Sequence, residues 1–415
     1  MAPALVQRAG LIPTPPQPRP SFARRGRANT LALQYYTPMH RDSGAAFYEF
    51  FAGGGLARLG LEPAFACAFA NDIDPAKGRA YEAAHGKGVF QLGDVWSLNA
   101  ADLPGCAALA WASFPCQDLS LAGARGGLAA PRSGTFWGYW RLIEALAAED
   151  RAPETLVLEN VTGLLTSHGG ADFSAIVGAL TSGGYRVGAL EIDAAHFTPQ
   201  SRARVFIVAT RASVASDLVA AAPSLPFHSP ALVNAVGVLP EDVRANWLWW
   251  RLPAPAARNT TLADILDRGE NWDDQEKTNR LLGMMSPAQR ARVLTLKKSG
   301  ATSVGALFRR IRVEDGKRVQ RAEARFDGLA GCLRTPAGGS SRQTLLVIDR
   351  GIVRSRLISP REAARLMGVS DAYPLPRTTT DALHLFGDGV CVSAVKYLSD
   401  HLLAPLAGMR AREAA

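Results

Sequence analysis

Short apolar segments alternate with helical patterns of hydrophobic residues between residue 43 and about residue 210. A strand buried on both faces is apolar throughout, so these segments predict strands. They lie at 46–51, 64–70, 107–113, 155–159, 187–192 and 204–209. Strands that alternate with helices are typical of a doubly wound α/β sheet with helices on both faces. We therefore predict an α/β domain over residues 43–210.

The alternation ends near residue 211, which indicates a second region of different construction. Residues 211–345 contain proline clusters, tryptophans and basic stretches, but no regular exchange of strands and helices. This pattern predicts a smaller, irregular domain. Helical patterns return in residues 346–415, where Ser359-Pro360 is a typical helix start and Val390–Leu403 predicts a closing amphipathic helix.

Candidate binding residues follow the first strands of the α/β domain. Gly53–Gly55 come after the first strand and precede a helical pattern, and such a turn allows a ligand to approach the backbone closely. Asp72 follows the second strand, and Asp94 follows a third short segment. An acidic residue at the end of the second strand of a nucleotide-binding sheet commonly accepts hydrogen bonds from ribose hydroxyls.

Candidate catalytic residues follow later strands of the same domain. Cys116 lies just after the strand at 107–113 and opens a loop rich in small and polar residues, so its thiol is placed to attack a ligand over the sheet. Glu159 ends another strand beside an apolar core, where burial can raise its pKa. Arg202 and Arg204 have strand spacing and project to one face, where they suit a carboxylate, phosphate or carbonyl oxygen.

In this order, these segments resemble the DNA (cytosine-5) methyltransferase family of the prokaryotic type. The similarity rests on several ordered motifs: Phe51-x-Gly53-x-Gly55, Phe114-Pro115-Cys116-Gln117, Glu159-Asn160-Val161, Gln200-x-Arg202-x-Arg204, the segment Arg356–Gly368 and the final Phe386-Gly387-Asp388-Gly389-Val390. It covers roughly residues 45–405. Each motif alone is weak or moderate, whereas the ordered set is specific. The resemblance implies a Rossmann-like methyltransferase sheet with a target recognition domain at 211–345, and a last helix that packs back on the catalytic domain.

The resemblance also implies a reaction: transfer of a methyl group from S-adenosylmethionine to C5 of a flipped cytosine in a specific sequence of double-stranded DNA. Cys116 would add to C6 and Glu159 would protonate or hydrogen-bond N3. Arg202 and Arg204 would hold the base carbonyl and the phosphate or glutamate near it. A base inside a duplex is out of reach of these groups, so it must be flipped out of the helix.

Cofactor and DNA contacts follow from the same resemblance. The expected cofactor-binding residues are Phe51, Gly53, Gly55, Asp72, Ile73, Asp94 and Pro115. The expected DNA-binding residues are Gln117, Ser120, Gln200, Arg334, Gly338, Gly339 and Arg342. Three motifs depart from the family pattern, with Glu49 for an aspartate, Asp72 for a glutamate, and Asp388-Gly389 for Asn-Ser in the last motif. We expect an active enzyme, because none of the three alters the cysteine, the glutamate or the arginines.

Charge and cysteine content are consistent with this picture. The net charge is +9, with a sequence pI of about 9.6, which favours an acidic polymer as partner. Residues 1–42 form a basic, proline-rich tail that we expect to be disordered. The five cysteines show no zinc-ligand or disulfide spacing, and no apolar stretch is long enough to span a membrane. We expect a monomer in the cytoplasm, associated with the nucleoid and without a metal ion.

Three alternatives remain open at this stage. The chain is either the partner of a restriction endonuclease or a solitary DNA methyltransferase. An RNA cytosine-5 methyltransferase on the same scaffold is a second enzyme hypothesis, and the long basic middle region favours duplex DNA over it. A catalytically inactive DNA-binding relative is the third hypothesis, and Cys116, Glu159 and Arg202 argue against it.

Overall fold

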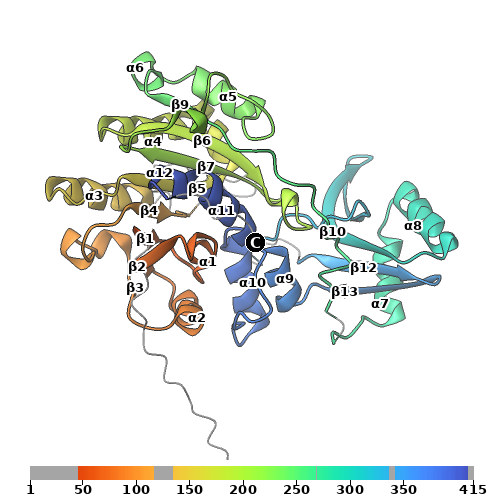
Figure 1. Cartoon of the computed structure of the whole chain (residues 1–415). Helices are drawn as coiled ribbons and strands as arrows, with labels where there is room; N and C mark the ends of the chain where they lie inside the picture. Colours follow the sequence, from red (N-terminus) through yellow and green to blue (C-terminus); the bar gives the residue numbers. More distant parts are fainter. Residues whose placement is uncertain (1–44, 116–133, 268, 336–341, 410–415) are drawn as a thin grey trace, which may run out of the picture. The chain divides into compact units, whose positions relative to one another are not determined.

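The computed structural model describes residues 45–115, 134–267, 269–335 and 342–409. Its larger sheet has the strand order β3-β2-β1-β4-β5-β7-β6-β9-β8 (Figure 1). The strands are β1 (Ala45–Phe50), β2 (Phe65–Asp72), β3 (Phe90–Leu92), β4 (Leu109–Ala112), β5 (Thr155–Val161), β6 (Arg186–Asp193), β7 (Ala203–Thr210), β8 (Val219–Ala220) and β9 (Trp247–Trp250). All the strands expected from the apolar segments are therefore present.

The direction of the chain reverses in the middle of this sheet. It runs outward from β1 through β2 to β3, then returns to β4 on the other side of β1, and these strands and β5 pair in parallel. β7 lies antiparallel between β5 and β6. In open α/β sheets, ligands bind beyond the carboxyl ends of the strands at such a switch point. The switch between β1 and β4 therefore marks the edge where the site is expected.

Helices cover both faces of the larger sheet, as a doubly wound fold requires. On β1, Phe47 points into one core and Tyr48 into the other, following the two-residue period of a strand. The described helices of this part are α1 (Leu56–Leu61), α2 (Pro75–His85), α3 (Thr135–Ala148), α4 (Ala171–Ser182), α5 (Pro230–Gly237), α6 (Glu241–Arg244), α11 (Val392–Leu398) and α12 (Ala404–Leu406). α11 lies against α1, so the end of the chain packs on the glycine-turn half of the sheet.

A second, smaller sheet has the order β11-β10-β12-β13. Its strands are β10 (Ser303–Glu314), β11 (Lys317–Arg325), β12 (Thr344–Asp349) and β13 (Ile352–Leu357). Helices α7 (Gln275–Gly283) and α8 (Pro287–Ser299) accompany it, and Met285, Val293, Leu307 and Leu346 share one apolar core there. The irregular middle region thus contains an antiparallel sheet that its polar and basic composition had not predicted.

The tryptophan-rich segment belongs to the larger sheet. β9 pairs with β6, and the buried Trp250 donates from Nε1 to the carbonyl oxygen of Val208 at 3.2 Å. Core packing explains this ring, as expected. The larger sheet therefore extends past residue 211, where the change of sequence pattern had placed the domain boundary.

The first C-terminal helix begins where local sequence predicts. α9 (Pro360–Leu366) has Pro360 in its first turn, and Ser359 and Glu362 form a capping box. Glu362 also forms a buried ion pair with Arg356, at 2.5 Å between Oε1 and Nη2. α10 (Thr379–Asp388) ends in the last motif. Within the described ranges, no helix has the length and apolar character needed to cross a membrane.

Candidate active site

The glycine turn after β1 is fixed by close packing on one side and open on the other. Gly53 and Gly55 have φ of 57° and 73°, a region that glycine adopts without strain. A Cβ at Gly54 would lie 2.5 Å from the hydroxyl of Tyr373, which donates to the Gly54 carbonyl. A Cβ at Gly53 would meet no atom within 4 Å. The backbone of Gly53 therefore has room for a ligand beside it.

Asp72 lies at the end of β2 and braces this turn. Its Oδ2 accepts from the amide N–H of Gly53 at 2.8 Å, and its Oδ1 accepts from that of Asp74 at 2.9 Å. Each carboxylate oxygen keeps a further lone pair for a hydroxyl donor. The structure therefore brings the glycine turn and Asp72 together, as the sequence predicted.

Asp94 follows β3, the strand next to β2. It caps a short helical turn, because its Oδ1 accepts from the amide N–H of Trp96 at 3.0 Å, and its Oδ2 makes no hydrogen bond within the described part of the chain. The Gly93 amide donates to the Asp72 carbonyl at 3.0 Å, which holds the ends of β2 and β3 together. Asp72 and Asp94 thus lie at one edge of the sheet.

Two large apolar side chains beside these aspartates are exposed. Ile73 is 65% exposed and Trp96 is 49% exposed. Ile73 is among the cofactor-binding residues expected from the sequence, whereas Trp96 is not, although its place two residues after Asp94 could have indicated it. Exposed apolar side chains next to open carboxylates suit a flat aromatic ligand with polar edges.

Glu49 on β1 lies beneath the glycine turn and is completely buried. Its carboxyl group accepts from the amide N–H of Arg58 and from the hydroxyl of Tyr81, both at 3.3 Å. Burial raises the pKa of Glu49 to about 8, although Arg58 and Tyr81 act in the opposite direction. The family's usual aspartate is thus replaced by a longer carboxyl side chain, which is predominantly protonated at pH 7.

This burial predicts a pH-dependent stability. The folded pKa of Glu49 is about 8 and its ordinary value is 4.5, so its contribution is fully present below pH 4.5 and is lost as the pH rises to about 8. Glu49→Gln should remove this loss, so the variant gains stability relative to the wild type by a few kcal/mol between about pH 5.5 and 9. Urea unfolding across this range measures the difference. If the free energies of unfolding of the two proteins changed in parallel with pH, the raised pKa of Glu49 would be contradicted.

The nucleophile candidate Cys116 lies outside the described residues, and so do Gln117, Ser120, Gly338 and Gly339. The described chain leads from β4 to Phe114, which is buried, and to Pro115, which is half-buried. Asn160, the residue after Glu159, donates from its side-chain amide to the Phe114 carbonyl at 3.3 Å. The end of β5 and the segment that enters Cys116 are therefore joined two residues before the thiol.

Buried Glu159 and half-buried Arg204 form an ion pair on neighbouring strands. Nε of Arg204 lies 3.2 Å from Oε1 of Glu159, and the two side chains are 15% and 7% exposed. β7 runs antiparallel to β5, which brings a residue near the start of β7 beside one near the end of β5. The structure therefore brings together the acid and one of the two arginines that the sequence argument proposed.

Arg202 has a different set of partners from the one expected. Its guanidinium donates to the carbonyl oxygens of Leu333 at 3.0 Å, Gly387 at 2.9 Å and Gly389 at 2.6 Å, and Nη1 lies 3.1 Å from the Cys332 sulfur. Burial, together with the nearby Arg204, lowers the pKa of Arg202 below its ordinary value. Both terminal nitrogens of Arg202 contact protein atoms and the residue is 2% exposed, so we assign it a positioning role. Direct contact with a base stays a prediction for Arg204.

The expected DNA contact by Gln200 is corrected by the structure. Gln200 is 0% exposed. Its Nε2 donates to the Leu366 carbonyl at 2.8 Å, and its Oε1 accepts from the amide N–H of Leu333 at 2.9 Å. Both ends of the amide are therefore used inside the protein, and Gln200 joins the segment at Leu333 to α9. Sequence spacing could not reveal this, because both partners are more than 100 positions away.

Arg334 and Arg342 flank residues 336–341, which are not described. Arg334 is exposed and Arg342 is half-buried. Between them and the sheet, the side-chain amide of Gln343 exchanges two hydrogen bonds with the backbone of Gly331. The two ends of the loop are thus held together. DNA contact by Arg334 and Arg342 stays a prediction.

Asp388, the acid in the last motif, has two partners from distant parts of the chain. Its Oδ2 forms an ion pair with Nζ of Lys77 on α2 at 2.8 Å, and its Oδ1 accepts from the Thr335 hydroxyl at 3.3 Å. Burial alone would lower the pKa of Lys77, but Asp388 and Asp72 outweigh it and raise that pKa. The departure from the family pattern therefore creates a link between α2, α10 and the segment at Thr335.

Comparison with known proteins places this site in a family. The family model for C-5 cytosine-specific DNA methylases matches residues 45–404. Type II methyltransferase M.NlaX of Neisseria lactamica is 28% identical over 369 residues, covering 88% of this chain and 98% of the relative. Type II methyltransferase M.HpaII of Haemophilus parainfluenzae is 27% identical over 383 residues, covering 88% and 90%.

A solved structure agrees on the fold. The structure of Entamoeba histolytica methyltransferase EhMeth matches with a TM-score of 0.54 at 16% identity, covering 88% of this chain and 99% of that one. At this identity the likeness shows the fold alone, and it supports the Rossmann-like methyltransferase architecture read from the strand order. The match to the family model over residues 45–404 shows that the protein belongs to the C-5 cytosine-specific DNA methylases.

Proposed function

We propose that the protein transfers a methyl group from S-adenosylmethionine to C5 of a flipped cytosine in a specific sequence of double-stranded DNA, through a covalent adduct between Cys116 and C6. The observation that supports the proposal is the Glu159–Arg204 ion pair between β5 and β7, because Asn160 joins the end of β5 to the segment that leads to Cys116. An acid and a guanidinium held next to the segment that leads to a cysteine suit activation of a pyrimidine ring.

The residues at the glycine turn fit S-adenosylmethionine. Gly53 has open space beside its backbone, and Asp72 and Asp94 offer carboxylate oxygens to ribose hydroxyls and an adenine amine. Ile73 and Trp96 present apolar surface for a flat base. When bound, this cofactor supplies an electrophilic methyl group on a sulfonium. The chain's own residues orient it through the glycine turn and the two aspartates.

The chemistry on the base is assigned to the protein's side chains. The Cys116 thiolate forms a bond to C6, which moves electron density onto C5 and N3. A proton or hydrogen bond from Glu159 at N3 stabilises this negative charge. Arg204 would hold the base carbonyl oxygen while staying paired with Glu159. C5 then forms a bond to the methyl group as the bond between that carbon and the donor's sulfonium breaks, which leaves S-adenosylhomocysteine. Water takes the C5 proton, the electron pair of that bond restores the double bond between C5 and C6, and the bond between C6 and sulfur breaks to release the Cys116 thiolate.

Asp72→Ala and Asp94→Ala are expected to weaken cofactor binding more than DNA binding. Each loses a hydrogen bond from a ligand hydroxyl or amine, which should cost roughly 1–3 kcal/mol of binding free energy. Asp72→Ala should have the larger effect, because Asp72 also braces the glycine turn at Gly53. Calorimetry with S-adenosylhomocysteine measures both, with duplex affinity as the control. Unchanged cofactor affinity in both variants would refute the assignment.

The proposed activity is tested by supplying labelled S-adenosylmethionine together with plasmid DNA or with tRNA. Label on plasmid DNA that appears as 5-methylcytosine is the expected result. Label on tRNA alone would favour the RNA alternative. Label on neither, with duplex binding retained, would indicate an inactive DNA-binding relative.

Sequence recognition is assigned to residues 211–345, since a catalytic site that acts on an extruded base has little access to the neighbouring base pairs. Side chains in the major groove must read those neighbours. Arg334 and Arg342 are candidates for this contact. The relatives M.NlaX and M.HpaII are named Type II methyltransferases, which supports the same class here, with a cognate restriction endonuclease or a solitary enzyme as the two alternatives.

A further inference from the structure

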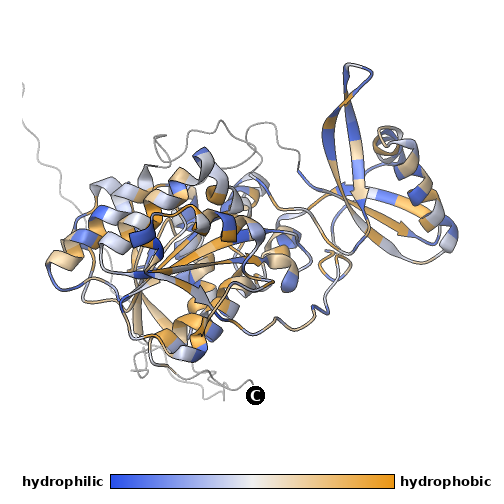
Figure 2. Ribbon diagram, turned by 90° about the horizontal axis from the view of Figure 1, so that it is seen from above, coloured by the Kyte–Doolittle hydropathy of each residue, from blue (hydrophilic) through white to orange (hydrophobic). Residues whose placement is uncertain are grey.

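The hairpin formed by β10 and β11 extends beyond the rest of its sheet. β12 pairs with β10 only as far as Leu307, so residues 308–323 form a two-stranded ribbon without a third strand (Figure 2). A two-residue turn closes it, with Asp315 and Gly316 at φ of 49° and 74°, the conformation that matches the twist of a hairpin. Six of the sixteen residues in this ribbon are basic and three are acidic.

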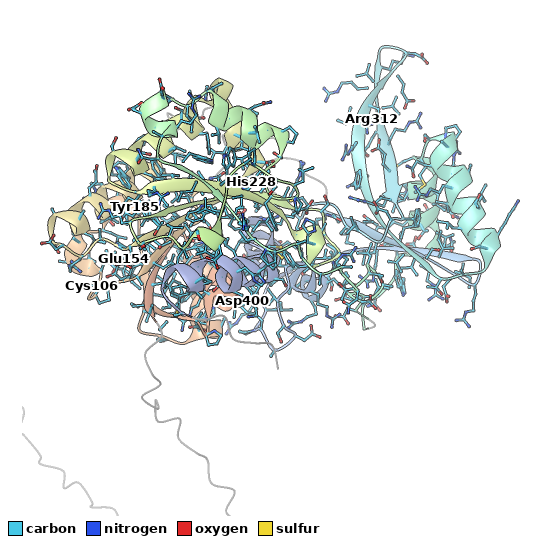
Figure 3. All side chains as sticks on the ribbon, turned by 45° about the horizontal axis from the view of Figure 1, so that its top comes forward. Cys106, Glu154, Tyr185, His228, Arg312 and Asp400 are labelled. Atoms are coloured by element: carbon cyan, nitrogen blue, oxygen red, sulfur yellow. The ribbon has the colours of Figure 1, made fainter. Side chains whose placement is uncertain are left out.

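Three arginines on one face of the ribbon lie beside carboxylates of the same face. Arg312 contacts Glu323 at 2.5 Å, Arg321 pairs with Glu314, and Arg310 lies 3.8 Å from Glu323. Figure 3 labels Arg312 on the extended part of the hairpin. Glu314 and Glu323 therefore offset part of the positive charge of this face, which also carries Lys317 opposite Glu314, and they already engage Arg312 and Arg321 before any partner binds.

The other face carries positive charge that no acidic side chain neutralises. Residues opposite each other in an antiparallel pair share a face, so this face contains Arg309, Ile311, Gln320 and the pair Val313–Arg318. Neither Arg309 nor Arg318 has an ion pair among the described residues. At the base of the ribbon Ala322, opposite Arg309, is buried and donates its amide N–H to the Met284 carbonyl at 3.1 Å. Nearer the tip, Ile311 is 54% exposed and Val313 is 72% exposed, so this face presents apolar surface between its arginines and the turn.

The spacing on this face matches a DNA groove. Arg309 and Val313 are four positions apart on one strand, which is about 13 Å at the rise of a strand, and Arg318 lies opposite Val313. The major groove of B-DNA is about 12 Å wide and admits a two-stranded ribbon. Two guanidiniums at this separation can reach phosphates on the two edges of the groove, with Ile311 and Gln320 between them over the base edges.

We propose that the β10–β11 ribbon enters the major groove of duplex DNA with the face of Arg309, Ile311, Val313, Arg318 and Gln320, and that Arg309 and Arg318 bind phosphates on opposite edges of the groove. This inference rests on the proposed function for the identity of the polymer. It adds a recognition element separate from the loop between Arg334 and Arg342.

The experiment compares two double variants that remove the same charge. Arg309→Ala/Arg318→Ala removes the unpaired arginines, and Arg312→Ala/Arg321→Ala removes two paired ones. Affinity for a 30-base-pair fluorescent duplex is measured by anisotropy over a salt series, with a single strand of the same sequence as second probe. The first variant should lose roughly 10- to 100-fold in duplex affinity at 0.1 M salt, and its salt slope should fall by about 2, while the second should lose less than about threefold.

Equal losses in the two double variants would overturn the proposal, because net charge alone would then explain the binding. Unchanged duplex affinity in both, or equal losses on duplex and single strand, would also overturn it. Thermal melting checks the fold, and Arg309→Gln/Arg318→Gln replaces the alanine variant if that variant melts early. Methyl transfer to plasmid is measured in parallel: its absence in the wild type refutes the proposed function, and the duplex comparison still decides the role of the ribbon.

Discussion

Cys116→Ser is expected to abolish methyl transfer while leaving the fold and DNA binding intact. A serine hydroxyl has a pKa far above neutral, and no neighbouring group is assigned to deprotonate it, so it cannot add to C6 as a thiolate can. Turnover should fall below a few per cent of the wild-type rate in a single-turnover assay.

The control for this variant is Cys106→Ser, which changes an exposed cysteine that precedes β4, whereas Cys116 follows this strand. It should keep full activity. Retention of substantial turnover by Cys116→Ser, with the control active, would remove Cys116 from the role of nucleophile.

Replacement by lysine should affect different properties at the two arginines: mainly stability at Arg202, just before β7, and mainly turnover at Arg204, within β7. Arg202→Lys should lower the free energy of unfolding by roughly 2–4 kcal/mol, because one ammonium group cannot serve the carbonyls of Leu333, Gly387 and Gly389 together. Arg204→Lys keeps a positive charge beside Glu159, so its stability should change by less than about 1 kcal/mol. Its turnover should nevertheless fall about 100-fold, since the planar guanidinium that orients base and acid is lost.

Urea unfolding and single-turnover kinetics on the same preparations separate the two effects. An Arg202→Lys protein as stable as the wild type would contradict the positioning role inferred from its buried hydrogen bonds. An Arg204→Lys protein with normal turnover would exclude Arg204 from the chemistry.

The parts of the site that sequence predicted are those determined by local order. Asp72, Asp94 and Glu159 each follow or end an apolar segment, and parallel pairing places such positions at one edge of a sheet. The start of α9 was also predictable, because the capping residues Ser359 and Glu362 lie within one helical turn. In these cases the chain carries the relevant information within a few residues.

The parts that sequence could not predict depend on contacts between distant segments. Lys77 and Asp388 are 311 positions apart, and the partners of Arg202 come from the end of the middle region, at Leu333, and from the last motif, at Gly387. Gln200 has the residue type of a DNA contact, yet complete burial assigns it to packing. The second sheet was missed because the exposed ribbon of β10 and β11 lacks the apolar content on which strand prediction relies.

Glu49, Lys77 and Asp388 show how the departures from the family pattern are accommodated. The longer carboxyl side chain of Glu49 is buried under the glycine turn and still accepts two hydrogen bonds. Asp388 is matched by the ammonium group of Lys77. Both changes thus have partners close to the proposed cofactor edge, and neither directly contacts the Glu159–Arg204 pair in the described hydrogen bonds and ion pairs.

The most direct measurement of the proposed mechanism is covalent trapping on DNA that contains 5-fluorocytosine in place of cytosine. Fluorine at C5 blocks the final elimination, so the enzyme with S-adenosylmethionine should form a stable protein–DNA adduct. Digestion and mass spectrometry should locate this adduct on the peptide that contains Cys116, and Cys116→Ser should form none. An adduct on another cysteine, or methylation of ordinary DNA without any trapped complex, would contradict the proposed covalent mechanism.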